Sequence, residues 1–401
     1  NGVKGGVWFS LIDKVYSVEN LRAAFAKVKA NRGSAGIDRQ TIEMFEANLE
    51  ANLGYLEEDL RTGTYCPQAI RRVYIPKPGK KELRPLGIPT VRDRVAQAAA
   101  RHVLEPIFER DFAAHSYGFR PGRSCKDALR RVDGLLKAGY TWVVDADLKS
   151  YFDTIPHDRL MGLIKTKVAD RRMLGLVEAY LKQEVMDTVQ SWTPEMGSPQ
   201  GAVLSPLLSN IYLDPLDHTM AYEGIEMVRY ADDFVLLCRS ETEARQALER
   251  VRQWTEQAGL RLHPDKTRLV DASERGGFDF LGYHFERGYR WPSDKSRKKL
   301  RDSIRDKTRR TNGHSLRTII TNVNRSLQGW FEYFQHSHRT AFAPLDGWVR
   351  MRLRSILRRR SGRRGVGIGK DHQRWPNKFF EAQGLFSLLA AHGAFRQSRR
   401  G

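Results

Sequence analysis

The sequence predicts an α+β protein of several domains, built around a hairpin that carries two adjacent carboxylates. YADD at 230–233 lies between apolar-rich segments, 226–229 and 234–238, which favour two strands joined by a tight turn. A second apolar strand, 142–148, has Asp145 and Asp147 on one face. Amphipathic helical patterns, such as Glu241 to Ala258, surround these strands. Sheet and helices together define the class.

Length and composition describe a globular chain without disulfides. A chain of 401 residues is too long for one ordinary core, so two to four domains are expected, and 40% hydrophobic residues exclude disorder. Cys66, Cys125 and Cys238 are odd in number and far apart, which predicts neither disulfides nor zinc but reduced thiols in a cytoplasmic protein. The sequence has no apolar run of membrane-spanning length, so no membrane partner is expected.

The positive charge is concentrated at one end of the chain. From Lys295 onwards there are 26 Lys and Arg against 6 Asp and Glu, so this segment carries +20 of the net charge of +21. Aromatic residues, among them Trp330 and Trp348, interleave with these charges. A helical core with a basic exterior would give this pattern, and so would a surface that binds a polyanion. The asymmetry favours a nucleic-acid partner.

The carboxylates predict a divalent cation. An isolated Asp-Asp pair is more often a solvated turn. Here a second strand brings Asp145 and Asp147 into an otherwise apolar run, where carboxylates need a partner or a metal. Like charges held close together in such surroundings are relieved by a bound divalent cation.

The order of motifs then identifies a family. DLKSYFD at 147–153, SPQG at 198–201 and YADD at 230–233 resemble three palm blocks of reverse transcriptases in their usual order. The resemblance narrows to bacterial group II intron-encoded proteins, which combine reverse transcriptase and maturase, through IPKP at 75–78, RPLGIP at 84–89, SYGFRP at 116–121 and LSPLLSN at 204–210. Each string is weak alone, but their joint order and spacing are specific. The resemblance runs from about Val15 to the C-terminus.

The resemblance implies a right-hand polymerase, with fingers, a palm whose antiparallel sheet carries the YADD hairpin, and a helical thumb or maturase domain. The implied domains are an N-terminal helical extension at 1–64, fingers at 65–140, palm at 141–292, thumb/maturase domain at 293–370 and a basic C-terminal module at 371–401. A change of composition near 290–295 supports the palm–thumb boundary. No cysteine follows Cys238, so the cysteine-paired HNH endonuclease of some relatives is not expected.

The resemblance also assigns the site. Two Mg²⁺ ions are implied, held by the carboxylates of Asp147, Asp232 and Asp233 and the carbonyl of Leu148, whereas Asp145 is expected to be structural. The implied nucleotide-binding residues are Lys77, Arg84, Phe152, Gln200, Gly201 and Lys266. Phe152 would block a ribose 2′-hydroxyl, although a Phe after a strand is more often core. Lys266 would be a general acid for the diphosphate, although a surface Lys near a turn is common.

The implied partners are a group II intron RNA, an RNA template with a DNA primer, target DNA and dNTPs. Arg120 is expected on the template strand. The basic C-terminal quarter is expected to anchor the intron RNA through Arg358, Arg359, Arg360, Arg363 and Arg364. Two other interpretations stay open: a splicing maturase whose polymerase site is idle, and a domesticated reverse transcriptase in phage defence or CRISPR adaptation. The leading interpretation is RNA-templated DNA synthesis in retrohoming.

Overall fold

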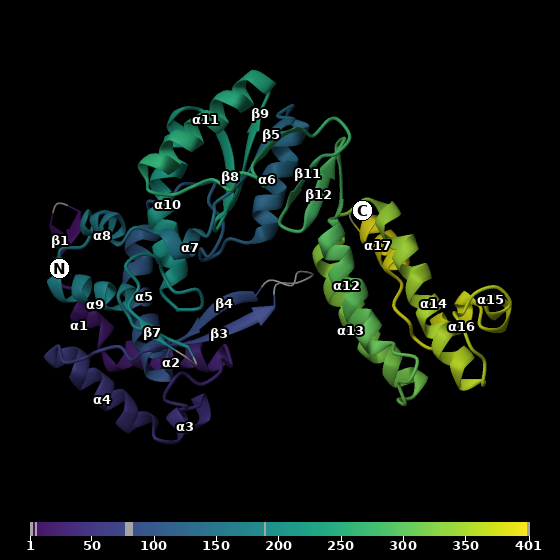
Figure 1. Ribbon diagram of the computed structural model, residues 1–401, viewed down its shortest axis with the longest axis horizontal. Helices are drawn as coiled ribbons and strands as arrows, with labels where there is room; N and C mark the ends of the chain where they lie inside the picture. The colour runs from purple at the N-terminus through teal and green to yellow at the C-terminus, as the bar shows by residue number, and fades with distance from the viewer. Residues whose placement is uncertain (1–2, 5, 77–82, 188–189, 399–401) are drawn as a thin grey trace. The chain divides into compact units, whose positions relative to one another are not determined.

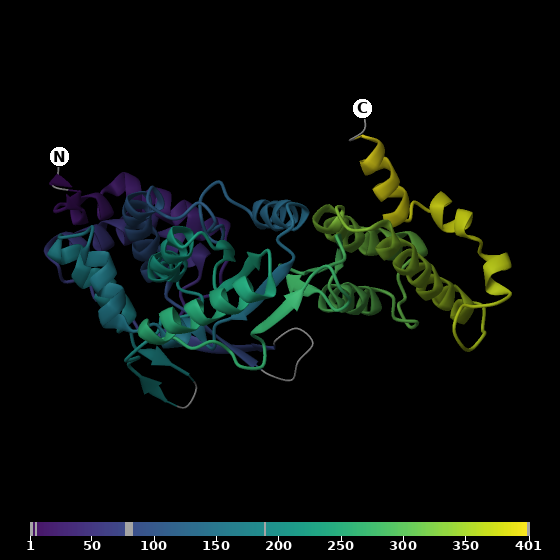
Figure 2. The same ribbon diagram turned by 90° about the horizontal axis from the view of Figure 1, so that it is seen from above.

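The computed structural model describes residues 3–4, 6–76, 83–187 and 190–398 (Figures 1 and 2). The chain forms two compact units, Asn1–Val270 and Asp271–Gly401. The units therefore separate about 20 residues before the compositional boundary expected near 290–295. None of the helices in the described ranges is both long and apolar enough to cross a membrane.

Unit 1 begins with helices that pack on one long helix. Their bounds are α1 (Ile12–Val15), α2 (Val18–Ala30), α3 (Ile42–Ala47), α4 (Leu49–Thr62) and α5 (Val91–Glu109), preceded by the short strands β1 (Val3–Lys4) and β2 (Val7–Trp8). Ser17 caps α2 by accepting a hydrogen bond from the Asn20 amide, and Thr41 caps α3 in the same way. Such side-chain oxygens satisfy amides that a helix start leaves unpaired. Phe25 and Phe45 stack with their ring centroids 5.5 Å apart, in the core that also contains α5.

A first sheet carries the predicted fingers hairpin. It has the order β4-β3-β6-β7, from β3 (Ile70–Pro76), β4 (Leu83–Ile88), β6 (Val185–Met186) and β7 (Ser191–Trp192). β3 and β4 are antiparallel, with Pro76 opposite Leu83. The expected tip of this hairpin, which includes Lys77, lies outside the described residues.

The second sheet carries the carboxylates. Its order is β10-β5-β9-β8, from β5 (Trp142–Asp147), β8 (Glu226–Tyr230), β9 (Asp233–Cys238) and β10 (Arg268–Asp271). The surrounding helices are α6 (Cys125–Lys137), α7 (Tyr151–Thr154), α8 (His157–Lys165), α9 (Arg171–Leu181), α10 (Ser205–Tyr222) and α11 (Glu241–Gln257). Figure 1 shows β5, β8 and β9 beside α10 and α11. Val144, Phe234 and Leu236 share one buried cluster with apolar residues of α10 and α11, which fixes the strands that end at the site.

Unit 2 combines a small sheet with helices. Its strands are β11 (Phe278–Phe280), β12 (Tyr283–Glu286) and β13 (Tyr289–Pro292), and its helices are α12 (Asp294–Lys307), α13 (Leu316–Phe334), the short η1 (Arg339–Ala341), α14 (Phe342–Arg360), α15 (Asp371–Arg374), α16 (Asn377–Ala382) and α17 (Leu388–Gln397). The Tyr283 hydroxyl donates to the Tyr333 carbonyl at 2.5 Å, and the Tyr333 hydroxyl donates to the Leu281 carbonyl at 2.7 Å. These bonds join the sheet to α13. They explain why residues 271–292 group with the helices of unit 2, although composition alone places them with the preceding segment.

Candidate active site

The carboxylates meet at one end of the second sheet. Asp147, the last residue of β5, lies directly opposite Asp233, the first residue of β9. Asp233 also pairs with Tyr230, so Ala231 and Asp232 form the two-residue turn between β8 and β9. The hairpin predicted from the sequence is therefore present, and it places three carboxylates together.

The turn is held by a close backbone approach. Ala231 has φ +61°, a left-handed conformation that is unfavourable for residues other than glycine. Gly118 lies against it so tightly that a Cβ added to Gly118 would be 2.2 Å from the Ala231 amide nitrogen. Glycine is required there because the neighbour is backbone and cannot move aside. The loop also pairs with β8, since the Tyr117 amide donates to the Arg229 carbonyl at 2.8 Å.

A buried ion pair supports the same turn from behind. Arg229 and Asp217 are each fully buried. The Arg229 Nε donates to the two Asp217 oxygens at 2.8 and 3.0 Å, and its Nη2 donates to Asp217 as well. The Arg229 Nη1 donates to the Ala231 carbonyl at 2.8 Å and to Asn210 Oδ1 at 3.0 Å. One guanidinium thus fastens the turn to α10.

This support was missed by reasoning from the sequence. Asn210 completes it, because its Nδ2 donates to the Gly118 carbonyl at 2.8 Å. Gly118 lies 92 residues before Asn210, and Arg229 lies on the strand that follows the helix of Asn210 and Asp217, so these contacts form only in the fold. A signal was present: Arg229 stands in an apolar strand, and Asp217 stands among apolar residues of α10. Charged residues in such runs are rarely buried unless they are paired.

Burial and like charge act on Asp232. Desolvation raises the pKa of Asp232 above its ordinary value, and the negative charge of Asp147 raises it further, while the charges of Arg84 and Arg229 oppose this. Lys266 neutralises Asp147, with Nζ 2.5 Å from Oδ2. Asp145 instead forms an ion pair with Arg268, at 3.0 Å between Nε and Oδ2, which agrees with a structural role.

The site has donors for a hard cation but not a preformed cage. Within the described ranges, no group of three or more His, Cys, Asp or Glu side chains is arranged to hold a metal ion. The carboxylate oxygens of Asp147, Asp232 and Asp233 are nevertheless the ligand type that Mg²⁺ prefers. Leu148 and Leu262 lie opposite each other in an isolated antiparallel β-bridge. The two hydrogen bonds of this bridge are made by their neighbours: Lys149 N donates to the Arg261 carbonyl, and His263 N donates to the Asp147 carbonyl. The Leu148 carbonyl is therefore not an acceptor in that bridge.

Three of the expected nucleotide-binding residues, Arg84, Gln200 and Gly201, lie on β4 and the 198–201 segment. Arg84 Nε donates to Gln200 Oε1 at 2.7 Å, and the Gly87 amide donates to the Gln200 carbonyl at 2.7 Å. Gly201 has φ +107°, and a Cβ there would be 2.5 Å from the Gly87 carbonyl oxygen. The close approach at Gly201 is thus made by β4 itself, which is a second reason for glycine besides the expected approach of a nucleotide.

Phe152 lies partly buried behind this segment. Its ring packs edge-on to Tyr151, with the centroids 5.4 Å apart, and borders the buried cluster of unit 1. Its carbonyl accepts a hydrogen bond from the Ser198 amide at 2.7 Å. The structure therefore joins Phe152 to the SPQG segment while leaving part of the ring exposed. Its role against a 2′-hydroxyl stays a prediction.

Arg120 has a structural role. Its side chain is 3% exposed and forms an ion pair with Glu109 at 2.8 Å. Its Nη1 donates to the Ala113 and Ser116 carbonyls at 2.6 and 2.9 Å. These bonds hold the loop that leads to Gly118. The prediction that Arg120 contacts the template is therefore corrected. A guanidinium that is buried and bonded in this way is unavailable for direct contact with a nucleic-acid strand at the surface.

The five C-terminal arginines divide into two groups. Arg358 donates to the Arg364 carbonyl at 2.7 Å and to Asp371 at 2.8 Å, so it closes the segment after α14. Arg360 donates to the carbonyls of Asn312 and His314. Arg359, Arg363 and Arg364 are exposed. Of the five, only Arg359, Arg363 and Arg364 are both exposed, as the predicted RNA contacts require, and free of the bonds by which Arg358 and Arg360 hold the fold together.

Two family matches cover most of the chain. Residues 75–285, more than half of the sequence, match the family described as reverse transcriptase (RNA-dependent DNA polymerase). Residues 297–375 match the group II intron, maturase-specific domain. The second match lies within unit 2 and begins in α12.

Individual relatives agree with these matches. Protein YkfC of Escherichia coli (strain K12) is 37% identical in an alignment of 291 positions that covers 63% of this chain and 76% of YkfC. Group II intron-encoded protein LtrA of Lactococcus lactis subsp. cremoris is 41% identical over 196 residues, which are 48% of this chain and 32% of LtrA. A solved structure, the partial Cas6-RT-Cas1–Cas2 complex, is 26% identical with a TM-score of 0.40, over 62% of this chain and 41% of that chain. The aligned region thus spans three quarters of YkfC but only a third of LtrA.

Proposed function

Because the chain belongs to the reverse transcriptase family and carries the maturase-specific domain of group II introns, we propose that it is an RNA-directed DNA polymerase and maturase that serves intron retrohoming. The observation that carries the polymerase is the placement of Asp147 opposite Asp233, with Asp232 in the adjoining turn. The right-hand polymerase fold provides that placement. The substrates would be dNTPs and an RNA template with a DNA primer, and the partners a group II intron RNA and target DNA.

The proposed cofactor is a pair of Mg²⁺ ions held by Asp147, Asp232 and Asp233 with the Leu148 carbonyl. The residues fit such a group because Asp232 is a desolvated carboxylate beside the like charge of Asp147, an arrangement that a cation relieves. When bound, such ions activate the primer hydroxyl and neutralise the leaving diphosphate. Lys266 would keep Asp147 neutralised before binding, and its ammonium can afterwards supply a proton to the diphosphate.

The proposed nucleotide site uses groups that the fold already orients. The bond from Arg84 to Gln200 engages Nε, so the forked Nη groups of this exposed arginine suit two phosphate oxygens. Burial raises the pKa values of Asp232 and Asp153, and the positive charge of the same guanidinium opposes part of that rise at both carboxyls. Phe152 would lie beside the sugar. We also propose that the protein acts in the cytoplasm, where its three free cysteines would stay reduced.

Primer extension tests the polymerase. The purified protein should extend a DNA primer on an RNA template with dNTPs and Mg²⁺. Asp232→Asn should lower the rate by at least about 100-fold, because groups that only support metal ligands already contribute about 10–100-fold. The matched control is Asp145→Asn, which removes a carboxylate of the neighbouring strand β5 that pairs with Arg268. Equal activity of the two variants would contradict the assignment. If the wild type assists splicing but never extends a primer, the chain is a maturase without polymerase use.

The maturase half needs a separate variant. Replacing Arg359, Arg363 and Arg364 together with Gln removes three exposed charges and spares Arg358 and Arg360, whose guanidinium groups serve the fold. Affinity for intron RNA should fall, and the log–log salt dependence should flatten by about 0.9 for each duplex phosphate that is no longer neutralised. Splicing should weaken while extension of a short primer at low salt persists. The opposite result, intact splicing with abolished extension, would make this segment a polymerase clamp.

A further inference from the structure

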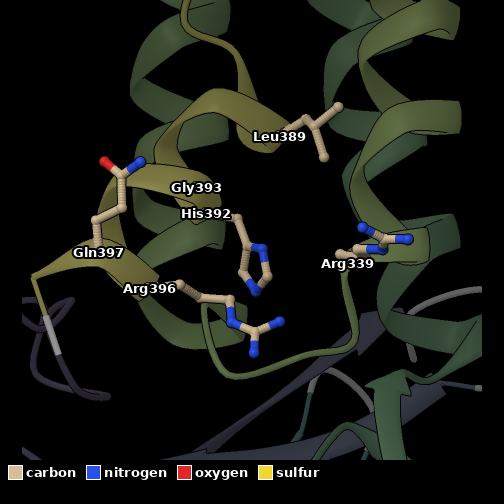
Figure 3. Close-up of a pocket in the computed structure, with 6 residues that line it drawn as sticks. All are labelled: Arg339, Leu389, His392, Gly393, Arg396 and Gln397. Carbon is tan, nitrogen blue, oxygen red and sulfur yellow. The ribbon is translucent and has the colours of Figure 1, made fainter. Parts of the chain in front are cut away.

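A basic hollow lies in unit 2, and its lining residues all belong to that unit. It has a volume of about 410 Å³ and is lined by Arg339, Leu389, His392, Gly393, Arg396 and Gln397. This size falls in the range of about 300–1,000 Å³ common for small-molecule sites. Figure 3 shows the His392 imidazole at its centre, with the side chains of Arg339 and Arg396 on two sides of it.

The two arginines provide charge that the fold does not use. Both are exposed, and within residues 271–398 neither guanidinium takes part in a hydrogen bond or ion pair. His392 is 6% exposed and bonds to the backbone of Ser337. Its burial and the charge of Arg396 lower the pKa of His392, so the ring is neutral at pH 7 and acts as a polar floor. The hollow therefore presents two cations to an anion.

An aromatic cluster includes His338, the residue directly before Arg339 in the chain. The His338 ring lies 4.9 Å from Tyr289 and 5.8 Å from Trp291, measured between centroids. Thr340 fixes two of these rings: it accepts from Trp291 Nε1 at 3.1 Å and bonds to His338 Nδ1 at 2.8 Å. Tyr289 is 55% exposed, so one ring of this cluster is open to solvent.

We propose that this site binds one unpaired nucleotide of a single-stranded nucleic acid. Arg339 and Arg396 hold its phosphate, with Gln397 and His392 beside it, and its base stacks on Tyr289. Guanidinium forks match phosphate oxygens, and an aromatic platform takes a base only when that base is unstacked from its neighbours. A duplex offers the phosphate without the free base, so the site selects single strands. This inference rests on the proposed nucleic-acid function and adds a subsite to it.

Binding of fluorescent 12-nucleotide single strands by the full chain tests the subsite, with a 12-base-pair duplex of the same sequence for comparison. Arg339→Gln/Arg396→Gln should weaken single-strand binding about tenfold and flatten its salt slope by about 0.7, because one phosphate is no longer neutralised. The matched control is Arg317→Gln/Arg325→Gln, which removes the same charge from exposed positions of α13. Arg339→Lys/Arg396→Lys should fall between wild type and the Gln variant, since it keeps the charge but not the forks.

A separate set of variants tests the proposed contact between the base and Tyr289. Tyr289→Ala should weaken single-strand binding about tenfold, Tyr289→Phe should leave it unchanged, and an abasic strand should make the two variants equal. Tighter binding of RNA than DNA would assign the site to intron or template RNA, and the reverse would assign it to target or product DNA. Two results overturn the subsite. One is that the Arg339/Arg396 variant loses no more affinity than the Arg317/Arg325 control, and the other is that it loses as much affinity for the duplex as for the single strand. Primer extension by the same proteins separates the two proposals, because it persists if only the subsite is wrong.

Discussion

Replacing both members of the buried pair Arg229–Asp217 separates stability from catalysis. Arg229→Met alone leaves the Asp217 carboxylate buried without its partner, and Asp217→Leu alone leaves the guanidinium in the same position. Breaking a fully buried pair in this way lowers the free energy of unfolding by about 3–5 kcal/mol. Since whole proteins are stable by only about 5–15 kcal/mol, each single variant should approach unfolding.

The double variant should behave differently. Exchange of a buried pair for apolar side chains is often neutral, so most of the cost should be recovered. The remaining cost in unfolding free energy is about 1–3 kcal/mol, because the Ala231 carbonyl and Asn210 Oδ1 no longer accept a hydrogen bond from Arg229. The two single changes should therefore be non-additive by at least about 3 kcal/mol. Activity should not recover, because the turn that holds Asp232 no longer has its anchor, and a displacement of about 1 Å can cost about 100-fold in rate.

The assay combines urea unfolding at low temperature with single-nucleotide extension under saturating primer–template. The free energy of unfolding of the double variant should fall by only about 1–3 kcal/mol relative to wild type. Its turnover should be about 100-fold slower, with its affinity for dNTP changed much less. Full activity in the double variant would refute the positioning role of Arg229. Additive single effects would refute the direct pairing with Asp217.

Three further outcomes follow from the same site. Gly118→Ala should lower kcat severely, because its Cβ would meet the Ala231 amide. The control, Gly134→Ala, lies in a helix where the added Cβ meets open space, so it should keep activity and raise the free energy of unfolding by about 0.5–1 kcal/mol. Equal kcat values of the two variants would contradict the contact. Asp232→Asn should raise the unfolding midpoint at pH 7, because the raised pKa makes ionisation oppose folding, and the gain should vanish below about pH 3.9; a gain independent of pH would exclude the charge as its cause. Phe152→Ala should reduce discrimination of dGTP over GTP in single-nucleotide rates, and an unchanged ratio would leave Phe152 as core only.

Local sequence signals predicted the elements around the site well. The YADD hairpin and the strand that carries Asp145 and Asp147 depend on neighbours in the chain, and the structure has both. The resemblance also implied a helical thumb or maturase domain at 293–370, and α12, α13 and α14 lie in that range. The unit boundary differs because tyrosine bonds between β12 and α13, which composition does not reveal, join the small sheet to the helices.

Long-range partners were beyond such reasoning. The resemblance assigned Arg120 to the template strand, and the charge count assigned Arg358 and Arg360 to intron RNA. Each of the three uses its guanidinium to bind carbonyls or carboxylates of the fold. An arginine has several donors, and a sequence does not say whether their acceptors belong to a partner or to the chain. The support of the turn by Asn210 and Arg229 was missed for the same reason: the acceptors are carbonyls of residues distant in sequence or at the turn itself.

The loop before Gly118 also bears on how the protein avoids self-association. β8 is an outer strand of its sheet, and outer strands expose backbone groups that can pair with another chain. Residues 115–117 occupy that edge at Arg229, whose amide donates to the His115 carbonyl at 3.0 Å. A change that lifts this loop uncovers a strand rich in apolar side chains. Loss of fit at Gly118 would then also appear as partial aggregation during expression, in addition to the lower kcat of the protein that remains in solution.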